Sequence, residues 1–340
     1  MVASSKKQTS SAPSEITLAD DAYHFRFYRG WPHLTWYTEW WYLAFSDPDS
    51  GWAGITALAI FNPENHLDLG RSGITTVLFP PVGAPVEQMN YLGVQDFTAS
   101  IDRADVTVGQ NTLRVEGDTY HLVTRDPEGE AGLDLRFRPV EKPQLMADEV
   151  VGYAEWEVAS WLVYMPSALV EGTIDTGGQQ IRLTQAAGYH DHNWGMWQVT
   201  KRTWAWAQFS APQQKLSFVL GLHAAFWFTT GRFRLGELEL QLPGELMRYE
   251  PQEWGHWKLF WRYPTRVQLT ALDATGEYRL EMRWMVTATA ALWKSPVPLF
   301  EQRARFDGRL LRRDKNTPAG WSEVTAFSEL GLAEYTATWL

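Results

Sequence analysis

The sequence predicts an all-β fold made of antiparallel strands, arranged as barrels or sandwiches. Three observations support this prediction. Turn-forming residues recur along the whole chain, short runs rich in Val, Ile, Thr and aromatic residues lie between them, and helical periodicity is scarce. The turn signals, which are clusters of Asp, Gly, Pro and Thr, lie at residues 47–51, 126–129, 175–178, 230–231, 273–276, 307–308 and 318–320.

The predicted strands follow one another from the first fifth of the chain to its last quarter. Each is rich in residues that favour a pleated, half-buried surface and is bounded by a turn signal. Residues 141–150 fit either a helical turn or a loop. In chain order the clearest strands cover residues 36–45, 54–61, 180–187, 203–209, 216–222, 266–272 and 278–287.

The strand near residue 40 is apolar on both of its faces. Successive side chains of a strand point to opposite faces, so Glu39 and Trp41 share one face while Trp40 and Tyr42 share the other. Because both faces are bulky, we expect this strand to be covered on both sides, as in a barrel wall packed against another layer.

Length and charge limit the class of protein. At roughly 150 residues per domain, 340 residues predict two domains. We expect a flexible tail over residues 1–20 and domains over 21–200 and 201–340, divided at a lysine-arginine pair. The chain has no cysteine, so disulfides and thiolate chemistry are excluded. Its net charge of −10 would repel a phosphate backbone, which makes nucleic acid an unfavourable partner.

Neither a secretory signal nor a membrane span is predicted. The first 15 residues are polar, without the apolar stretch that a signal peptide needs. The longest apolar passage, residues 216–228, is well short of the roughly 20 residues that span a bilayer. We therefore expect a soluble, cytoplasmic protein.

The segment that carries the most polar chemistry is 188–195, with the sequence GYHDHNWG. If it is extended, alternate side chains point to opposite faces. One face then carries Tyr189, Asp191 and Asn193. The other carries His190, His192 and Trp194.

One interpretation of this segment is a metal site. His190 and His192 lie two residues apart on one face, and a third ligand could come from His33, Glu39 or His223. A pair of histidines is not enough, because such a site needs at least three protein ligands and supporting partners. We therefore predict no metal.

A second interpretation concerns the opposite face. Asp191 lies between Tyr189 and Asn193, and an aromatic pocket would disfavour its ionised form. Asp191 is then a candidate acid or hydrogen-bond donor. The alternative is that the aspartate and the histidines form a buried hydrogen-bonded lattice that only ties strands together.

Three motifs in order, at residues 39–42 (EWWY), 165–172 (MPSALVEG) and 188–195, resemble the signatures of a known superfamily. Its members are two-domain lipocalin-like proteins, which include AttH-type proteins, carotenoid 1,2-hydratases and lipocalin-like Diels–Alderases of polyketide pathways. The resemblance covers the chain from about Ala22 to Leu340. The motifs are specific for the superfamily and do not select one reaction.

The resemblance implies two lipocalin-like β domains packed together, a mostly apolar cavity and no organic cofactor. In the hydratases a Tyr-x-Asp pair is thought to serve the acid chemistry, and Tyr189 and Asp191 have that spacing. In the cyclases a glutamate and an asparagine line the pocket, and Glu39 and Asn62 match them. The continuation His-Asp-His-Asn-Trp is that of the AttH and cyclase branches, which weakens the hydratase assignment.

On this basis we expect a cofactor-independent cyclase that performs an intramolecular (4+2)-type cycloaddition on a linear, polyketide-like polyene in an aromatic-lined cavity. Holding the substrate in the reactive orientation can by itself supply much of the reduction in the activation barrier of this reaction. The alternatives are a hydratase, dehydratase or cation cyclase of an isoprenoid with Asp191 as acid, and a non-catalytic carrier of a hydrophobic ligand. The expected catalytic residues are Asp191, Tyr189 and Glu39, and the expected substrate-binding residues are Trp41, Asn62, His192, Asn193, Trp194, Trp204 and Trp206.

Overall fold

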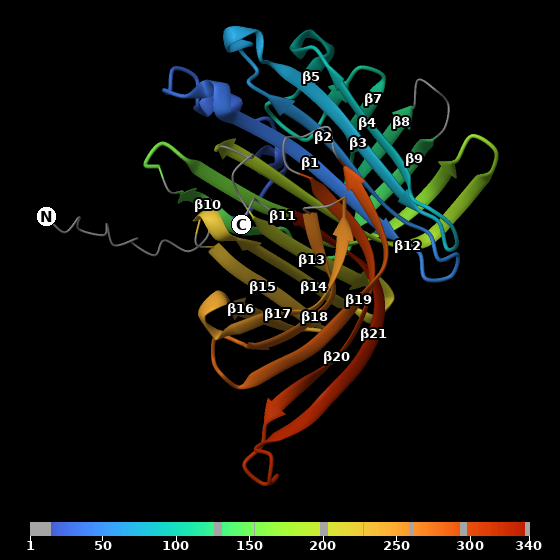
Figure 1. The fold of residues 1–340 in the computed structure, drawn as a ribbon, viewed down its shortest axis with the longest axis vertical. Coiled ribbons are helices and arrows are strands. Elements are labelled where there is room, and N and C mark those ends of the chain that lie inside the picture. The colour runs from blue at the N-terminus through green and yellow to red at the C-terminus, as the bar shows by residue number, and fades with distance from the viewer. Residues whose placement is uncertain are drawn as a thin grey trace, which may run out of the picture.

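The computed structural model of the chain consists of two curled antiparallel β-sheets stacked on each other (Figure 1). It describes residues 15–125, 131–152, 154–197, 203–226, 228–258, 261–292 and 298–336. Within these ranges all helices are short 3-10 turns, and the rest of the regular structure is strand. The all-β prediction is confirmed.

The first sheet contains twelve strands and forms the upper half of Figure 1. Its order is β4-β3-β2-β1-β12-β11-β9-β8-β7-β6-β5, and β10 pairs with β11 outside this path. The strands are β1 (Tyr37–Ser46), β2 (Ala53–Phe61), β3 (Arg71–Phe79), β4 (Val86–Leu92), β5 (Phe97–Ala99), β6 (Val106–Val108), β7 (Asn111–Glu116), β8 (Thr119–Arg125), β9 (Gly132–Pro139), β10 (Gln144–Val151), β11 (Val158–Asp175) and β12 (Gln180–Met196).

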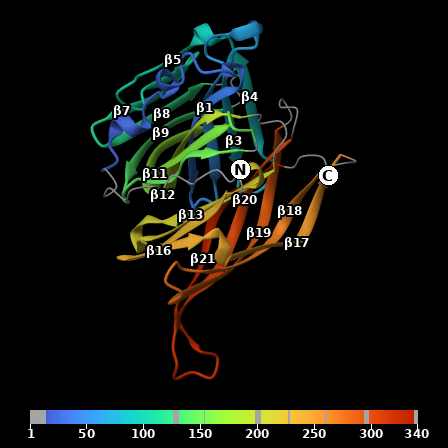
Figure 2. The ribbon, with the colours of Figure 1, turned by 90° about the vertical axis from the view of Figure 1, so that its left-hand side faces the viewer.

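The second sheet contains nine strands in the order β16-β15-β14-β13-β21-β20-β19-β18-β17. Figure 2 shows its long strands curving away beneath the first sheet. The strands are β13 (Trp204–Ala211), β14 (Leu216–His223), β15 (Phe228–Leu235), β16 (Leu238–Pro243), β17 (Met247–Trp257), β18 (Trp261–Leu272), β19 (Tyr278–Leu292), β20 (Leu299–Arg313) and β21 (Trp321–Thr336).

Single 3-10 turns connect the strands. Three of them precede β1 and fold the segment before it onto the first sheet. The turns are η1 (Leu18–Asp21), η2 (Phe25–Phe27), η3 (Leu34–Trp36), η4 (His66–Asp68), η5 (Val94–Asp96), η7 (Pro212–Gln214), η8 (Ala224–Phe226) and η9 (Gly244–Leu246).

Strand β1 lies in the middle of the first sheet, between β2 and β12, and is buried on both faces. Trp41 and Leu43 pack into the core inside the first sheet. Tyr42 and Ala44 pack into a second core that lies between the two sheets. The alternation predicted from the sequence is confirmed, and its cause is that each face of the strand meets a different apolar layer.

The interface between the sheets is both apolar and hydrogen-bonded. Residues of both sheets, Tyr189 and Trp206 among them, share one core. Ser210 Oγ on β13 donates to the backbone oxygen of Gly188 on β12 at 3.2 Å. The face of the first sheet that carries Asp191 is therefore the face that the second sheet covers.

Three sequence-based expectations concern segments rather than residues. The boundary predicted at residues 200 and 201 lies outside the described residues, and so do residues 1–14 of the predicted tail.

The prediction of a helical turn or loop at 141–150 is wrong for most of its length, because β10 forms there. Pairing with β11 through a ladder with two register shifts overrides the weak local pattern.

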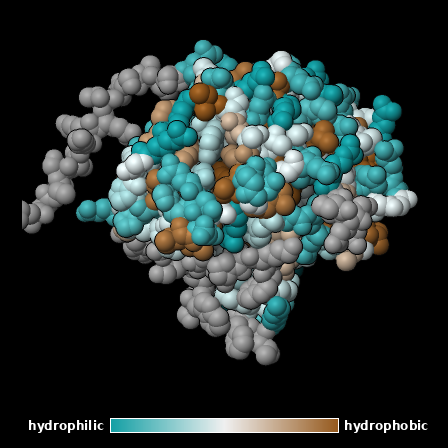
Figure 3. All heavy atoms as spheres, turned by 90° about the horizontal axis from the view of Figure 1, so that it is seen from above, coloured by the Kyte–Doolittle hydropathy of each residue, from teal (hydrophilic) through white to brown (hydrophobic). Residues whose placement is uncertain are grey.

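The described part of the chain has no helix long and apolar enough to cross a membrane. Seen from above, the surface of the first sheet and its connections is mainly hydrophilic, with apolar side chains scattered in separate spots (Figure 3). Such scattered apolar residues are normal for a protein surface.

Candidate functional site

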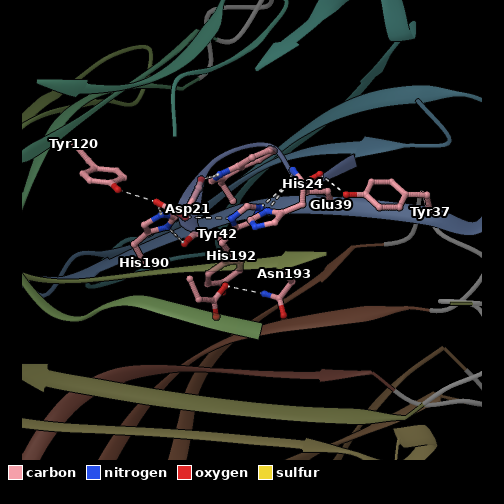
Figure 4. Close-up of polar contacts among 11 residues, drawn as sticks. Asp21, His24, Tyr37, Glu39, Tyr42, Tyr120, His190, His192 and Asn193 are labelled. Atoms are coloured by element: carbon pink, nitrogen blue, oxygen red, sulfur yellow. Dashed lines mark hydrogen bonds and ion pairs between the residues drawn. The ribbon is translucent and has the colours of Figure 1, made fainter. Parts of the chain in front are cut away.

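The polar segment at the end of β12 divides into two clusters on opposite faces of the first sheet. In the ladder, Asp191 lies opposite Tyr42 of β1 and Val163 of β11, whereas His192 lies opposite Trp41 and Leu162. Figure 4 shows His190 and His192 on the side away from the second sheet and Asn193 on the side that faces it. The alternation predicted for this segment is confirmed.

Gly195 lets the segment approach β11 closely. Its φ of 145° lies in the region that favours glycine, and an added Cβ would lie 2.1 Å from the backbone oxygen of Val158. The polar residues before it are therefore held tightly between β1 and β11.

The inner cluster consists of Asp21, His24, Glu39, His190 and His192, in the core of the first sheet. Glu39 accepts hydrogen bonds from the Tyr37 hydroxyl at 2.5 Å, the His24 backbone N–H at 2.8 Å and His192 Nε2 at 3.0 Å. Asp21 Oδ2 lies 2.9 Å from His190 Nε2. Figure 4 shows these side chains as one continuous network.

The charges of the inner cluster compensate one another. Burial opposes ionisation of Asp21, but the imidazoles of His190 and His192 outweigh it and lower the pKa of Asp21. Burial also opposes ionisation of Glu39, and hydrogen bonds from His192 and His24 lower its pKa. Burial lowers the pKa of His192, but its contacts with Asp21 and Glu39 outweigh burial and raise it. The cluster therefore holds ionised carboxylates against an imidazolium.

The metal interpretation of this segment pairs His190 with His192, but His190 lies against Asp21 instead. Ligand atoms of His24, Glu39 and His192 do lie within 4.8 Å of one another. Glu39 Oε1 lies 3.0 Å from His192 Nε2 and 3.4 Å from His24 Nδ1, so contacts among the three side chains themselves account for this arrangement.

The outer cluster is centred on Asp191, on the face covered by the second sheet. Its Oδ2 accepts hydrogen bonds from the Tyr189 hydroxyl at 2.7 Å and from Trp161 Nε1 at 2.9 Å. Its Oδ1 accepts one from Asn193 Nδ2 at 3.0 Å. Burial raises the pKa of Asp191 to about 6, although Tyr189 and Trp161 oppose this shift. Asp191 can therefore gain or lose a proton near neutral pH.

Two glutamates of the second sheet face this cluster. Glu301 on β20 and Glu334 on β21 are partners in the ladder. The Tyr42 hydroxyl donates to Glu301 at 3.0 Å, and the indole N–H of Trp204 donates to Glu334. Burial raises the pKa of both glutamates, and for Glu301 the negative charge of Glu334 adds to the effect. The pair therefore favours holding a proton between its carboxyl groups.

A cavity of about 120 Å³ lies between the two sheets at this point. The carboxyl-bearing side chains Asp191 and Glu334 both line it. Its lining includes buried residues such as Trp161 and Trp206 and half-buried residues such as Val150 and His223. Five tryptophans contribute to its wall: Trp40, Trp161, Trp197, Trp204 and Trp206.

Four of the predicted site residues line this cavity: Asp191, Asn193, Trp204 and Trp206. Tyr189 does not line the cavity, but its hydroxyl donates to Asp191 and accepts from Trp206, which both do.

Four others belong to the inner face instead. Glu39 and His192 are part of the inner cluster. Trp41 stacks on His192 with ring centroids 4.4 Å apart, and Trp194 stacks on His24 at 3.8 Å. Asn62 lies in the turn after β2, with a φ of 47°, and its side chain bonds the backbone of His66.

Sequence reasoning missed Asp21, His24, Glu301 and Glu334. Asp21 and His24 lie in a stretch without strand pattern, close to the predicted tail. The two glutamates are 33 residues apart and belong to no motif. The only signal in the sequence is that Glu334 directly follows the apolar residues 330–333, where an acid is costly unless it has a partner; Glu301, followed by Gln302 and Arg303, carries no such signal.

No protein-family profile and no curated protein matches the chain. Solved structures do match it. A protein described as AttH from Nitrosomonas europaea is 12% identical, with a TM-score of 0.68, over 98% of this chain and 100% of that one. Kievitone hydratase from Nectria haematococca is 14% identical, with a TM-score of 0.62, over 88% and 89% of the two chains. CghA is 12% identical, with a TM-score of 0.61, over 89% and 88%.

These similarities extend over both sheets. They confirm the resemblance to the two-domain lipocalin-like proteins at the level of fold. At such identities they show the fold alone, and the activity has to be argued from the site.

Proposed function

We propose that the protein is a cofactor-independent cyclase that folds a hydrophobic, polyene-like molecule in the cavity between the two sheets. The observation that carries the proposal is the position of Asp191, a buried carboxyl group held by three donors at a cavity walled by five tryptophans. An apolar cavity with a few fixed polar groups is the usual form of a small-molecule site.

The size of the cavity limits how the substrate binds. A volume of about 120 Å³ is similar to that of an engineered cavity, roughly 150 Å³, that binds benzene. The reacting part of the substrate therefore occupies the cavity, and the rest of a longer chain must lie outside it. Confinement of the reacting part restricts its conformations, which is the main contribution that a cycloaddition needs.

Asp191 contributes a proton or a charge at a fixed position. Tyr189 and Trp161 both bond Oδ2, so the carboxyl group cannot rotate freely. In its protonated form it can donate to a carbonyl of the substrate and stabilise the negative charge that develops there. In its ionised form it can accept a proton.

A second candidate function is a hydro-lyase. The observation that favours it is that two separate carboxyl groups, Asp191 from the first sheet and Glu334 from the second, line the same cavity. One could transfer its proton to an alkene carbon, water would add to the resulting cation, and the other would accept the proton that water releases. Kievitone hydratase, named for such a reaction, shares the fold.

The test is to incubate the protein with a panel of linear isoprenoid and polyketide-type polyenes in deuterated water and to analyse the products by mass spectrometry. A concerted cyclisation gives an isomer of the substrate without deuterium at carbon. A hydro-lyase changes the mass by one water and places solvent deuterium at carbon. Tight retention of an unchanged polyene, with no product from any member of the panel, would contradict both and identify a carrier.

Variants connect the product to the site. We expect Asp191→Asn to lower the rate by about 10²- to 10⁴-fold, which is typical for loss of an acid or base. The matched control is Glu237→Gln, which changes an acid on the surface of the second sheet that is paired with Lys215. Equal rates for Asp191→Asn and the wild type would exclude Asp191 from the reaction.

A further inference from the structure

Acidic side chains outnumber basic ones among the described residues around the cavity. Asp191 and Glu334 line it, and Glu301 is the ladder partner of Glu334 on the neighbouring strand. Among the described residues, no lysine or arginine lines the cavity. The inner cluster differs, because there each carboxylate has an imidazole partner. A positively charged ligand would therefore not compete with a lysine or arginine of the described residues for these carboxyl groups.

The indole N–H groups of three of the five wall tryptophans are occupied by the protein itself. Trp161 donates its indole N–H to Asp191, Trp204 to Glu334, and Trp206 to the Tyr189 hydroxyl oxygen at 3.3 Å. These three rings therefore have no N–H left for an anion or a carbonyl of the ligand. What they can offer to a ligand is ring carbon and the negative face of the π-system.

Several rings around the cavity are close to perpendicular. Trp40 and Trp197 have centroids 5.4 Å apart and planes at 73°. Trp161 and Phe228 have centroids 6.0 Å apart and planes at 83°. Rings in different orientations, combined with carboxylates, form the kind of cage that binds quaternary ammonium groups.

We propose that this cavity is selective for an organic cation of the alkylammonium class, bound by the tryptophan rings and by Asp191 and Glu334. A quaternary ammonium group has no N–H. It therefore needs no hydrogen-bond partner from the tryptophan wall. A bound cation favours the ionised form of Asp191 and Glu334, whereas an anionic ligand of the same size would find no lysine or arginine among the described lining residues.

This inference rests on the proposed function in one respect, which is that both place the ligand in the same cavity. It narrows the substrate class to molecules that carry an alkylammonium group next to the reacting part. The same surroundings would also stabilise a carbocation formed during the reaction, which would favour an acid-initiated cyclisation or hydration over a concerted cycloaddition.

The test compares two probes of nearly the same shape, phenyltrimethylammonium and tert-butylbenzene, by isothermal titration calorimetry of the full chain. We expect the cation to bind at least about tenfold more tightly, which corresponds to roughly 1.4 kcal/mol. Glu334→Gln keeps the acceptor for Trp204 and removes the charge, so it should reduce this preference about tenfold and leave tert-butylbenzene binding unchanged. Glu237→Gln, on the surface, should change neither affinity.

Three results would overturn the inference. Equal or tighter binding of tert-butylbenzene by the wild type would show a cavity that is only apolar, and the proposed function would stand. An unchanged preference in both Glu334→Gln and Asp191→Asn, with wild-type melting temperatures, would show that the cation binds elsewhere. Absence of binding by both probes would contradict the cavity as a ligand site, and with it the proposed function.

Discussion

The acids that lie on the two sides of β12 differ in their tendency to ionise. On the inner face, Asp21 and Glu39 are ionised and paired with histidines. On the outer face, Asp191 and Glu334 have raised pKa values, line a cavity and bind uncharged donors. Asp21, Glu39 and Asp191 are all almost completely buried, so burial alone cannot explain the difference.

The difference comes from the partners. A carboxylate that meets an imidazole is stabilised as an ion and becomes part of the structure. A carboxyl group whose partners are uncharged donors or other carboxyl groups has a raised pKa, so it can exchange a proton with a ligand closer to neutral pH. Neighbouring residues of one strand, His190 and Asp191, can thus serve structure and chemistry separately.

The largest effect on stability should come from breaking the inner cluster. Glu39→Ala leaves the charge of His192 and the hydroxyl of Tyr37 without their common partner in the core. Loss of one member of a buried ion pair costs about 3–5 kcal/mol. Urea unfolding followed by circular dichroism measures this change. A loss below about 1 kcal/mol, typical of exposed pairs, would show that the inner cluster does not stabilise the fold.

The two faces should also give opposite dependences of stability on pH. The folded-state pKa of Asp191, about 6, lies above the ordinary value of 3.8, so the folded state binds more protons between these values. Its contribution to the free energy of unfolding therefore falls as pH rises from about 4 to about 6, by at most about 3 kcal/mol. Asp21 and Glu39 have lowered pKa values, so the stability they provide is lost only as pH falls below their ordinary range.

Asp191→Asn separates these contributions. The variant should gain stability relative to the wild type as pH rises from 4 to 6, and both proteins should lose stability together at lower pH. The measurement is the urea midpoint across this pH range. Parallel curves for the two proteins would contradict the assignment of a raised pKa to Asp191.

A smaller effect is expected for Tyr189→Phe. The change removes one of the three donors to Asp191 and leaves the ring in place. A hydrogen bond to a charged group is worth about 1.5–3 kcal/mol, so at neutral pH the variant should lose about that much stability. The pKa of Asp191 should rise further, because its ionised form has lost a donor. An unchanged pH profile would show that Tyr189 does not control the proton on Asp191.

The smallest effect should come from Asn62→Ala. Asn62 has a positive φ and holds the turn after β2 by two hydrogen bonds to the backbone of His66. Its replacement should cost about 1 kcal/mol and leave the affinity for phenyltrimethylammonium unchanged. A large loss of affinity would place Asn62 in the binding site, as its match to the cyclases implies.

The sequence contains enough information for the fold class and for the two faces of the strands near residues 40 and 190. Alternation in a strand is a local property, so the separation of Asp191 from His192 could be predicted. Contacts between segments that are far apart in the sequence could not be predicted in this way. The approach of Asp21 to His190 and of Glu301 to Tyr42 depends on how the chain returns to the sheet, and no local pattern encodes it.

The most direct test of the account measures the proton on Asp191 itself. Infrared difference spectra between the wild type and Asp191→Asn, recorded across pH, show the carboxyl band of this residue. We expect it to titrate with a pKa of about 6 and to shift when phenyltrimethylammonium binds. A pKa at or below the ordinary 3.8, with no response to the probe, would mean that Asp191 is one more structural carboxylate.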